Sequence, residues 1–285
     1  MSRMTLMAIM TRVIRVTRVT RVIRVTRVIR VTRVTRMRPR PGVLLALLGL
    51  PVMAATGASN PAPDNAAAHD PVQLAQSLLQ DSDAYWTQEI KSLGSSYELP
   101  GVTVFEGSIS GVCMAGSPLT GSFYCPSDEH VYLDRDFVRQ VARRAGPATD
   151  LALAFLIGHE VGQHVQFLVG TTALVEQARA NSTAELSART WATAQLQADC
   201  YAGLWVRWAL MHAEIGPGES TSAALDAVAA ASQALQAHLP AHATMVDPVL
   251  TYGTPAQRLK WFQRGEDTGQ FKDCDTFGAE AAGKL

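Results

Sequence analysis

The sequence predicts a mainly helical α+β domain with a small β-sheet. Its 285 residues are 47% hydrophobic, which suffices for one domain with a substantial core. Apolar residues recur at helical spacing, with Pro and Gly in the gaps, over residues 136–145, 149–169, 184–213, 220–239 and 255–265. Short runs of β-forming residues, broken by Gly, Ser and Pro, precede them at 102–106, 123–125 and 130–133. We therefore expect the strands to come first and the helices to build most of the core.

Residues 1–36 contain a low-complexity repeat of Arg-Val-Thr and Arg-Val-Ile. Its three-residue period matches neither a helix nor a strand, so it cannot give either structure a one-sided apolar face. A basic arm that binds nucleic acid or acidic lipid is one interpretation. We favour the other, a translated repeat upstream of the true start, because Met37 opens a self-sufficient export signal.

Residues 37–55 have the three parts of a secretory signal peptide. Arg38 and Arg40 form the charged part, residues 43–55 form the apolar part, and Val52-Met53-Ala54 is a small-residue cleavage site. The apolar part has 13 residues, too few to cross a bilayer, which takes about 20. We expect an exported protein, periplasmic or extracellular, that has no transmembrane helix after signal removal.

Two segments follow the signal. Residues 56–70 are rich in Ala, Pro, Asn and Asp, a composition that predicts a disordered linker. Residues 71–285 are expected to form the folded domain. Their first element should be an amphipathic helix over residues 72–93, where Leu, Tyr, Trp and Ile recur at near-helical spacing.

The net charge of the whole chain is zero, but the part after residue 40 is acidic. Of the 25 basic residues, 12 lie within residues 1–40, which contain no acidic residue. The remainder therefore has 13 basic and 25 acidic residues. This balance argues against nucleic acid or an anionic membrane as the main partner, because both attract positive charge.

The apolar segment 151–170 carries a polar group in its middle, formed by His159, Glu160, Gln163 and His164. Buried imidazoles and carboxylates cost several kcal/mol unless they are paired or bind a metal. In the helical pattern H-E-x-x-H, two His bind zinc and the Glu is the general base. Here Gln163 holds the second His position. His164 lies about 140° round the helix from His159, so the two cannot bind one ion from a regular helix.

A second helix within residues 193–205 carries Gln195 and Asp199 on one face, four residues apart. With this pair, the chain resembles the neutral zinc metallopeptidases of bacteria, zincin-like hydrolases whose motifs read roughly HEVGHH and ELQADCFAG. Further similar segments lie at residues 121–128, 131–134, 253–258 and 274–277. The resemblance runs from about Pro71 to Phe277 and implies a mainly helical zincin-like metallopeptidase domain with a small β-sheet.

The resemblance also implies roles for the polar residues. His159 matches the first zinc ligand, and Glu160 matches the catalytic base. Gln163 stands at the position of the second His ligand and Gln195 at that of the Glu ligand. Asp199 would orient His159 through a hydrogen bond. Zinc is thus the cofactor by family, but two of its three ligand positions are substituted.

Two interpretations of the function stay open. In a pseudopeptidase or peptide-binding module, Gln163 and Gln195 would bond to each other and to the His159–Asp199 pair, satisfying groups that zinc once held. In a working zinc-dependent peptide hydrolase, His159, an amide oxygen and waters would hold the metal. Amide oxygen suits calcium better than zinc, which favours the first interpretation. Either protein would take a peptide or protein as substrate or ligand. Tyr252 stands where the family usually has a His.

Four cysteines behind an export signal favour disulfides, and four allow three connectivities. We choose Cys113–Cys125, which would close the loop ahead of the sheet, and Cys200–Cys274, which would tie the C-terminal tail to the second motif helix. A cysteine zinc site is the rival interpretation, but the sequence has no C-x-x-C pair. His164 is expected to be a packing or surface-facing imidazole.

Overall fold

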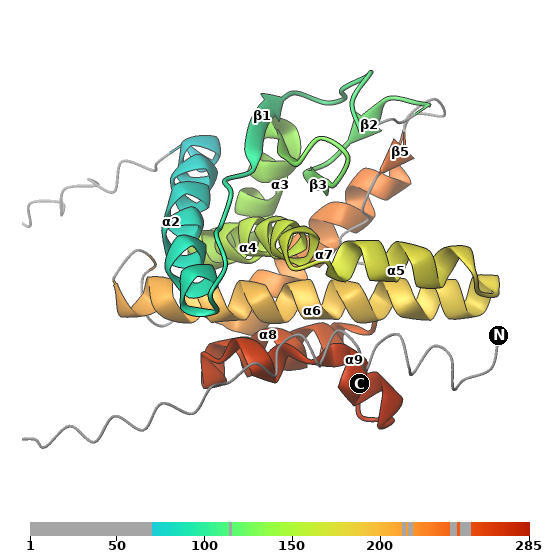
Figure 1. Cartoon of the computed structure of the whole chain (residues 1–285). Coiled ribbons are helices and arrows are strands. Elements are labelled where there is room, and N and C mark those ends of the chain that lie inside the picture. The colour runs from blue at the N-terminus through green and yellow to red at the C-terminus, as the bar shows by residue number, and fades with distance from the viewer. Residues whose placement is uncertain (1–69, 114–115, 213–214, 216–218, 240–243, 246–251) are drawn as a thin grey trace, which may run out of the picture.

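The computed structural model describes residues 70–285, except 114–115, 213–214, 216–218, 240–243 and 246–251 (Figure 1). The expectations for the repeat, for the signal peptide and for residues 56–69 of the linker lie outside the described residues and stay predictions. Helix α2 (Pro71–Ser92) is the first described element. Asp70 caps it by accepting a 3.0 Å hydrogen bond from the Val72 backbone, and Pro71 holds a position that needs no N–H.

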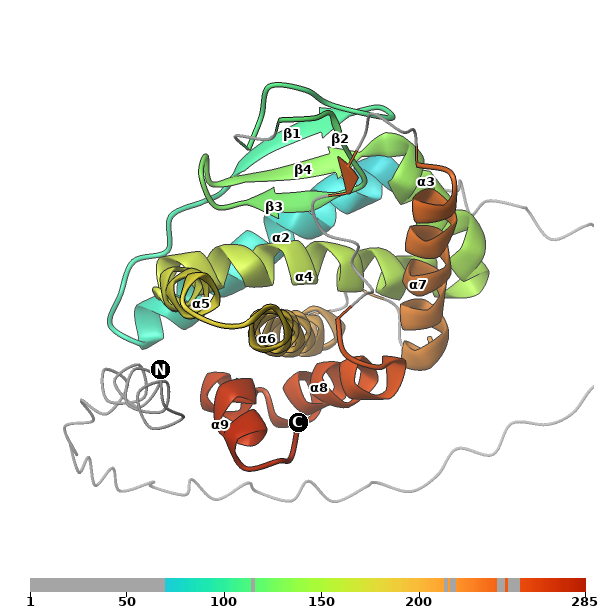
Figure 2. The same cartoon turned by 90° about the vertical axis from the view of Figure 1, so that its right-hand side faces the viewer.

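Helices form the larger part of the described chain, and several of them lie in layers below a sheet (Figure 2). After α2 come α3 (Arg135–Ala145), α4 (Thr149–Leu168), α5 (Thr171–Ala180), α6 (Ala184–Met211), α7 (Thr221–Ala237), α8 (Pro255–Thr268) and α9 (Thr276–Ala281). Two 3₁₀ turns, Gly146–Ala148 and Phe271–Cys274, join neighbouring helices. Seen along α6, the order from top to bottom is the sheet, α4, α6 and then α8.

The sheet has three strands in the order β1 (Gly101–Phe105), β4 (His130–Asp134) and β3 (Phe123–Cys125). Strand β1 is parallel to β4, with Val102 opposite Val131. Strand β3 is antiparallel to β4, with Tyr124 opposite Val131. A separate two-stranded pair joins β2 (Leu119–Thr120) to β5 (Thr244–Met245).

The predicted mainly helical α+β class is confirmed, and so is the small sheet. Two helices and two short strands were not predicted from the sequence, namely α5, α9, β2 and β5. The last long helix was predicted to end at residue 265, whereas α8 continues to Thr268 and stops at Gly269, which adopts the left-handed conformation with φ 58°. Within the described ranges, no helix is long and apolar enough to cross a membrane.

Small residues let α4 and α6 cross at close range. A Cβ added at Gly158 would lie 2.9 Å from the Cβ of Ala202, and one at Gly162 would lie 2.9 Å from the Ala198 carbonyl oxygen. Both distances are too short for a side chain, so the crossing requires glycine on α4. The glycines flank His159, and the crossing therefore fixes this residue against the polar face of α6.

Glycines also allow α8 to pack closely against α6. A Cβ at Gly203 would collide with the Phe262 carbonyl, and one at Gly265 would collide with the Cys200 carbonyl. The backbones of α6 and α8 are thus almost in contact (Figure 1). This approach brings side chains from the first turn of α8 to the face of α6 that carries Asp199.

Both chosen disulfides are present, with sequence separations of 12 for Cys113–Cys125 and 74 for Cys200–Cys274. Cys200 lies on α6, and Cys274 ends the turn after α8, so this bridge joins the C-terminal segment to the centre of the fold.

We expect removal of the longer bridge to cost more stability. The Cys200→Ser/Cys274→Ser variant should lose about 1.5 kcal/mol more than Cys113→Ser/Cys125→Ser, because the longer loop restricts the unfolded chain more. Urea unfolding of oxidised protein measures both losses. Equal losses would show that strain or local packing, not loop length, decides the contribution of each bridge.

A second prediction concerns Asp83 on α2, whose Oδ1 accepts a 2.7 Å hydrogen bond from the Tyr97 hydroxyl. Burial raises the pKa of Asp83 from 3.8 to about 6, and the Tyr97 bond only partly opposes it. The folded state therefore holds the proton more tightly than the unfolded state. This group's contribution to stability falls as pH rises from about 4 to about 6 and is constant above that range.

Asp83→Asn should stabilise the protein by about 1 kcal/mol at pH 7.5, a figure reduced for the partial exposure of the site. Asparagine still accepts the Tyr97 bond and carries no charge. The gain should shrink toward pH 4.5 in denaturant unfolding curves. A gain that does not change with pH would assign the effect to packing.

Candidate functional site

His159 lies at the crossing of α4 and α6, completely buried. Its Nδ1 donates a 2.8 Å hydrogen bond to Oδ1 of Asp199. Its Nε2 lies 2.8 Å from Oε1 of Gln195, an amide oxygen that can only accept. Gln195 and Asp199 are one helical turn apart on α6, so this face of α6 contacts both nitrogens of the ring.

Asp199 also forms a buried ion pair with Arg258 of α8. Arg258 Nε donates to Oδ2 and Nη2 donates to Oδ1, each at 3.0 Å. Arg258 is 5% exposed, and Asp199 is not exposed at all. Burial alone would raise the pKa of Asp199, but the charge of Arg258 and the contacts with His159 outweigh it and hold the pKa below its ordinary value. Asp199 is therefore an anion that orients His159.

Glu160 and Gln163 lie on α4 beside His159. Glu160 is completely buried, and Gln163 is 8% exposed. Gln163 Nε2 donates a 3.3 Å hydrogen bond to Oε2 of Glu160. The buried centre thus combines two acidic side chains, Glu160 and Asp199, with His159 and Arg258.

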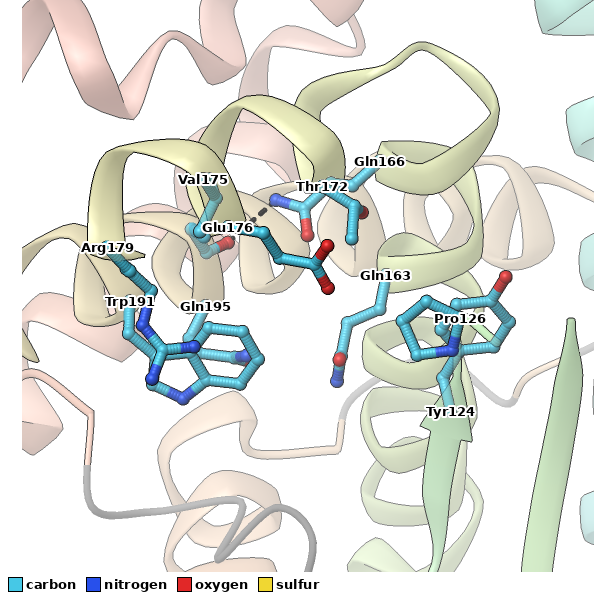
Figure 3. A pocket seen from close by; sticks show the side chains of 11 residues that line it. Tyr124, Pro126, Gln163, Gln166, Thr172, Val175, Glu176, Arg179, Trp191 and Gln195 are labelled. Atoms are coloured by element: carbon cyan, nitrogen blue, oxygen red, sulfur yellow. Dashed lines mark hydrogen bonds between the residues drawn. The ribbon is translucent and has the colours of Figure 1, made fainter. Parts of the chain in front are cut away.

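A pocket of about 150 Å³ lies next to this centre, between α4, α5, α6 and the end of β3 (Figure 3). Gln163 and Gln195 both line it, so the two substituted positions face the same space. Aromatic side chains also line it, Tyr124 from β3 and Trp191 from α6. The remaining lining residues are Pro126, Gln166, Thr172, Val175, Glu176, Arg179 and Ala194.

Tyr252 contributes indirectly to this pocket. Its ring meets the Trp191 ring edge to face, with 5.8 Å between centroids. On the family pattern this position usually carries a His. Here the side chain supports an aromatic wall of the pocket.

His164 is a packing residue and does not face the surface. It is completely buried, and its Nδ1 lies 2.9 Å from the Tyr124 hydroxyl while its Nε2 lies 2.7 Å from the Glu98 carbonyl. Burial lowers the pKa of His164, although the bond to Glu98 partly opposes this. A neutral ring that accepts from Tyr124 and donates to Glu98 satisfies both contacts. Helix α4 is regular here, so His164 points away from His159.

The residues at the centre do not fit a catalytic zinc shell. Such shells use three protein ligands drawn from His nitrogen, Cys sulfur and carboxylate oxygen. The three matching positions here supply one imidazole and two amides, and the Nε2 of the imidazole already contacts the Gln195 amide. Among the residues that the structure describes, no group of three or more His, Cys, Asp and Glu side chains could hold a metal ion. The assignment of ligand and base roles therefore stays a prediction.

Arg258 is the site residue that sequence reasoning missed. The sequence does hold a signal for it, because Arg258, Trp261, Phe262 and Gly265 lie on one face of α8 and are all buried. A charged residue on an apolar face indicates a buried partner, since arginine is rarely buried unless paired. The partner itself could not be read from that pattern.

The structure holds the His-Glu pair of α4 against an aspartate of α6, the arrangement that the resemblance to zinc metallopeptidases implied. The comparisons with known proteins agree. A family model described as "Putative neutral zinc metallopeptidase" matches residues 40–277. The chain belongs to this family.

The chain is also similar to two proteins of other bacteria. "Uncharacterized protein YpfJ" of Escherichia coli (strain K12) is 34% identical over 201 residues, which cover 70% of this chain and 69% of the relative. "Uncharacterized protein Rv2575" of Mycobacterium tuberculosis (strain ATCC 25618 / H37Rv) is 35% identical over 213 residues, with the same coverage. No solved structure matches the chain, so the zincin-like part of the predicted fold stays a prediction.

Proposed function

We propose that this protein is a pseudopeptidase that binds peptide or protein segments. The observation that carries the proposal is the donor set around His159, where two amides replace the imidazole and carboxylate that zinc requires. The Gln195 amide contacts His159, and the Gln163 amide contacts Glu160. These contacts pair two buried polar atoms, His159 Nε2 and Glu160 Oε2, with side-chain amides.

The pocket supports binding of a peptide. Gln163 and Gln195 can each donate and accept hydrogen bonds, as a peptide backbone does. Tyr124 and Trp191 add apolar area on opposite sides, and aromatic walls with a few polar groups are typical of ligand pockets. A site with these amides at the ligand positions can hold a peptide without cleaving it.

The test combines metal content, binding and hydrolysis on the exported protein. Elemental analysis after purification should give far less than one zinc per chain. Calorimetric titration with zinc should show weak binding, and added zinc should not produce hydrolysis of a mixed peptide pool. The same pool should contain peptides that the protein retains in affinity selection.

A zinc-to-protein ratio near one would overturn the proposal if zinc-dependent hydrolysis accompanied it. Glu160→Gln is the deciding variant, because Glu160 matches the base of the family and remains buried at the centre. Loss of hydrolysis in this variant would establish the alternative, a working zinc-dependent peptide hydrolase with a distorted metal shell.

We also propose that the protein acts outside the cytoplasm, in the periplasm or beyond the cell. Two disulfides and the absence of a membrane-spanning helix from the described residues are compatible with export. The mature chain should begin near Ala55, and mass spectrometry of exported protein measures its N-terminus. A mature N-terminus that retains the Arg-Val repeat would contradict both the signal peptide and the proposed true start.

A further inference from the structure

Arg179 is held in a fixed position at the rim of the pocket. Its guanidinium carbon lies 4.6 Å from the centroid of the Trp191 ring, and its Nε donates a 3.1 Å hydrogen bond to the Ser187 hydroxyl. Stacking and this bond restrain a side chain that is otherwise flexible. Figure 3 shows Arg179 and Trp191 on one side of the pocket, with Gln163 and Tyr124 across from them.

The nearest acidic candidate does not pair with Arg179. Glu176 lies three residues earlier on α5 and also lines the pocket, at a spacing that favours ion pairs on a helix. The ion pairs of the described residues nevertheless include none between Arg179 and an acidic side chain. Arg179 thus lines the pocket with a guanidinium that stacks on Trp191 and forms none of the ion pairs found among the described residues.

We propose that this pocket selects peptides that carry a carboxylate and that Arg179 binds that carboxylate. The inference rests on the proposed peptide-binding function and adds the chemical class of the ligand. Guanidinium binds carboxylate through two parallel hydrogen bonds, which fixes orientation as well as charge. The carboxylate can come from a peptide C-terminus or from an acidic side chain.

Glu176 should oppose the same ligand. It is an exposed carboxylate in a pocket where Arg179 is the basic lining residue, so its charge repels an incoming anion. Substitutions at these two residues should therefore change the affinity for a carboxylate peptide in opposite directions. Removing the charge of Arg179 should weaken binding of a carboxylate peptide, and removing that of Glu176 should strengthen it.

The experiment uses four matched pools of random fluorescein-labelled heptapeptides and the full oxidised protein. The pools combine a free or amidated C-terminus with Asp or Asn at the fourth position. Peptides retained by the protein are identified by mass spectrometry, and their affinities are measured by fluorescence anisotropy. The proteins are wild type, Arg179→Gln, Arg179→Lys and Glu176→Gln. Arg144→Gln is the charge-matched control, because Arg144 is exposed on α3 and lies outside the pocket.

Wild type should bind the selected carboxylate peptides about 10- to 100-fold more tightly than their uncharged counterparts. Arg179→Gln should abolish this preference, Arg179→Lys should retain part of it, Glu176→Gln should increase affinity, and Arg144→Gln should change nothing. If the preference follows the free C-terminus, Arg179 binds the C-terminal carboxylate. If it follows Asp at the fourth position, Arg179 binds the side-chain carboxylate. Thermal unfolding of each variant confirms that it is folded.

Two other outcomes are distinguishable. If peptides bind equally well with and without a carboxylate, or if folded Arg179→Gln keeps the preference, the inference about Arg179 is wrong while the peptide-binding function stands. If wild type retains no peptide from any pool, the proposed function fails, and the inference fails with it.

Discussion

Replacing Arg258 by alanine should destabilise the protein by about 3 to 5 kcal/mol. The change leaves Asp199 buried without its bidentate partner, and removal of one member of a buried ion pair costs about this much. Arg258 also lies over the Phe155 ring, 5.2 Å from its centroid, so some packing is lost as well. Urea unfolding at pH 7.5 measures the loss.

The matched control is Arg264→Ala, on the same helix. Arg264 is exposed and its closest contact to the Asp273 carboxylate is 3.7 Å, so its removal should cost about 1 kcal/mol or less. Adding Asp199→Asn to Arg258→Ala should recover part of the loss, because the unpaired charge is then gone. If Arg258→Ala cost no more than Arg264→Ala, the buried pair between α6 and α8 would not exist in solution.

Periodicity predicted the long elements well because one physical pattern specifies them. Helices α4 and α6 are apolar over many turns, and strands β3 and β4 contain runs of buried β-forming residues. Helix α5 was not predicted, although Thr171, Val175 and Ala178 are buried at helical spacing, because only two of these three residues are apolar. The pairing of β2 with β5 could not be predicted, since two-residue strands that lie far apart in sequence carry no recognisable period.

The sequence predicted which site residues share a face of one helix, but not how the two helices are placed against each other. The four-residue spacings placed His159 with Gln163 and Gln195 with Asp199, but no spacing says which faces meet. That information lies in the crossing of α4 and α6, which depends on contacts such as that of Gly162 with the α6 backbone. Arg258 enters through a third helix, 59 residues from Asp199 in the sequence. Its role becomes visible only when the helices are packed.

The Gln163→His/Gln195→Glu double variant should bind zinc on the order of 10³-fold more tightly than wild type. Four-ligand structural zinc sites bind with about 10 to 16 kcal/mol, so two added ligands contribute several kcal/mol even after strain is subtracted. The distance between the ligand positions is close to that in a zinc site. Nε2 of His159 and Oε1 of Gln195 lie 2.8 Å apart, whereas two ligand atoms of a tetrahedral zinc ion lie about 3.3 Å apart.

Neither single variant should approach the double variant, because each has only two strong ligands. Calorimetric titration with zinc on wild type, both singles and the double therefore gives a coupling energy. Gln166→His/Gln197→Glu is the matched control, since these buried residues bond to each other between the same two helices and neither stands at a position that matches a zinc ligand of the family. It should bind zinc no better than wild type. A folded double variant that also binds no better would mean that Gln163 and Gln195 do not occupy ligand positions, and that the two helices meet in another register.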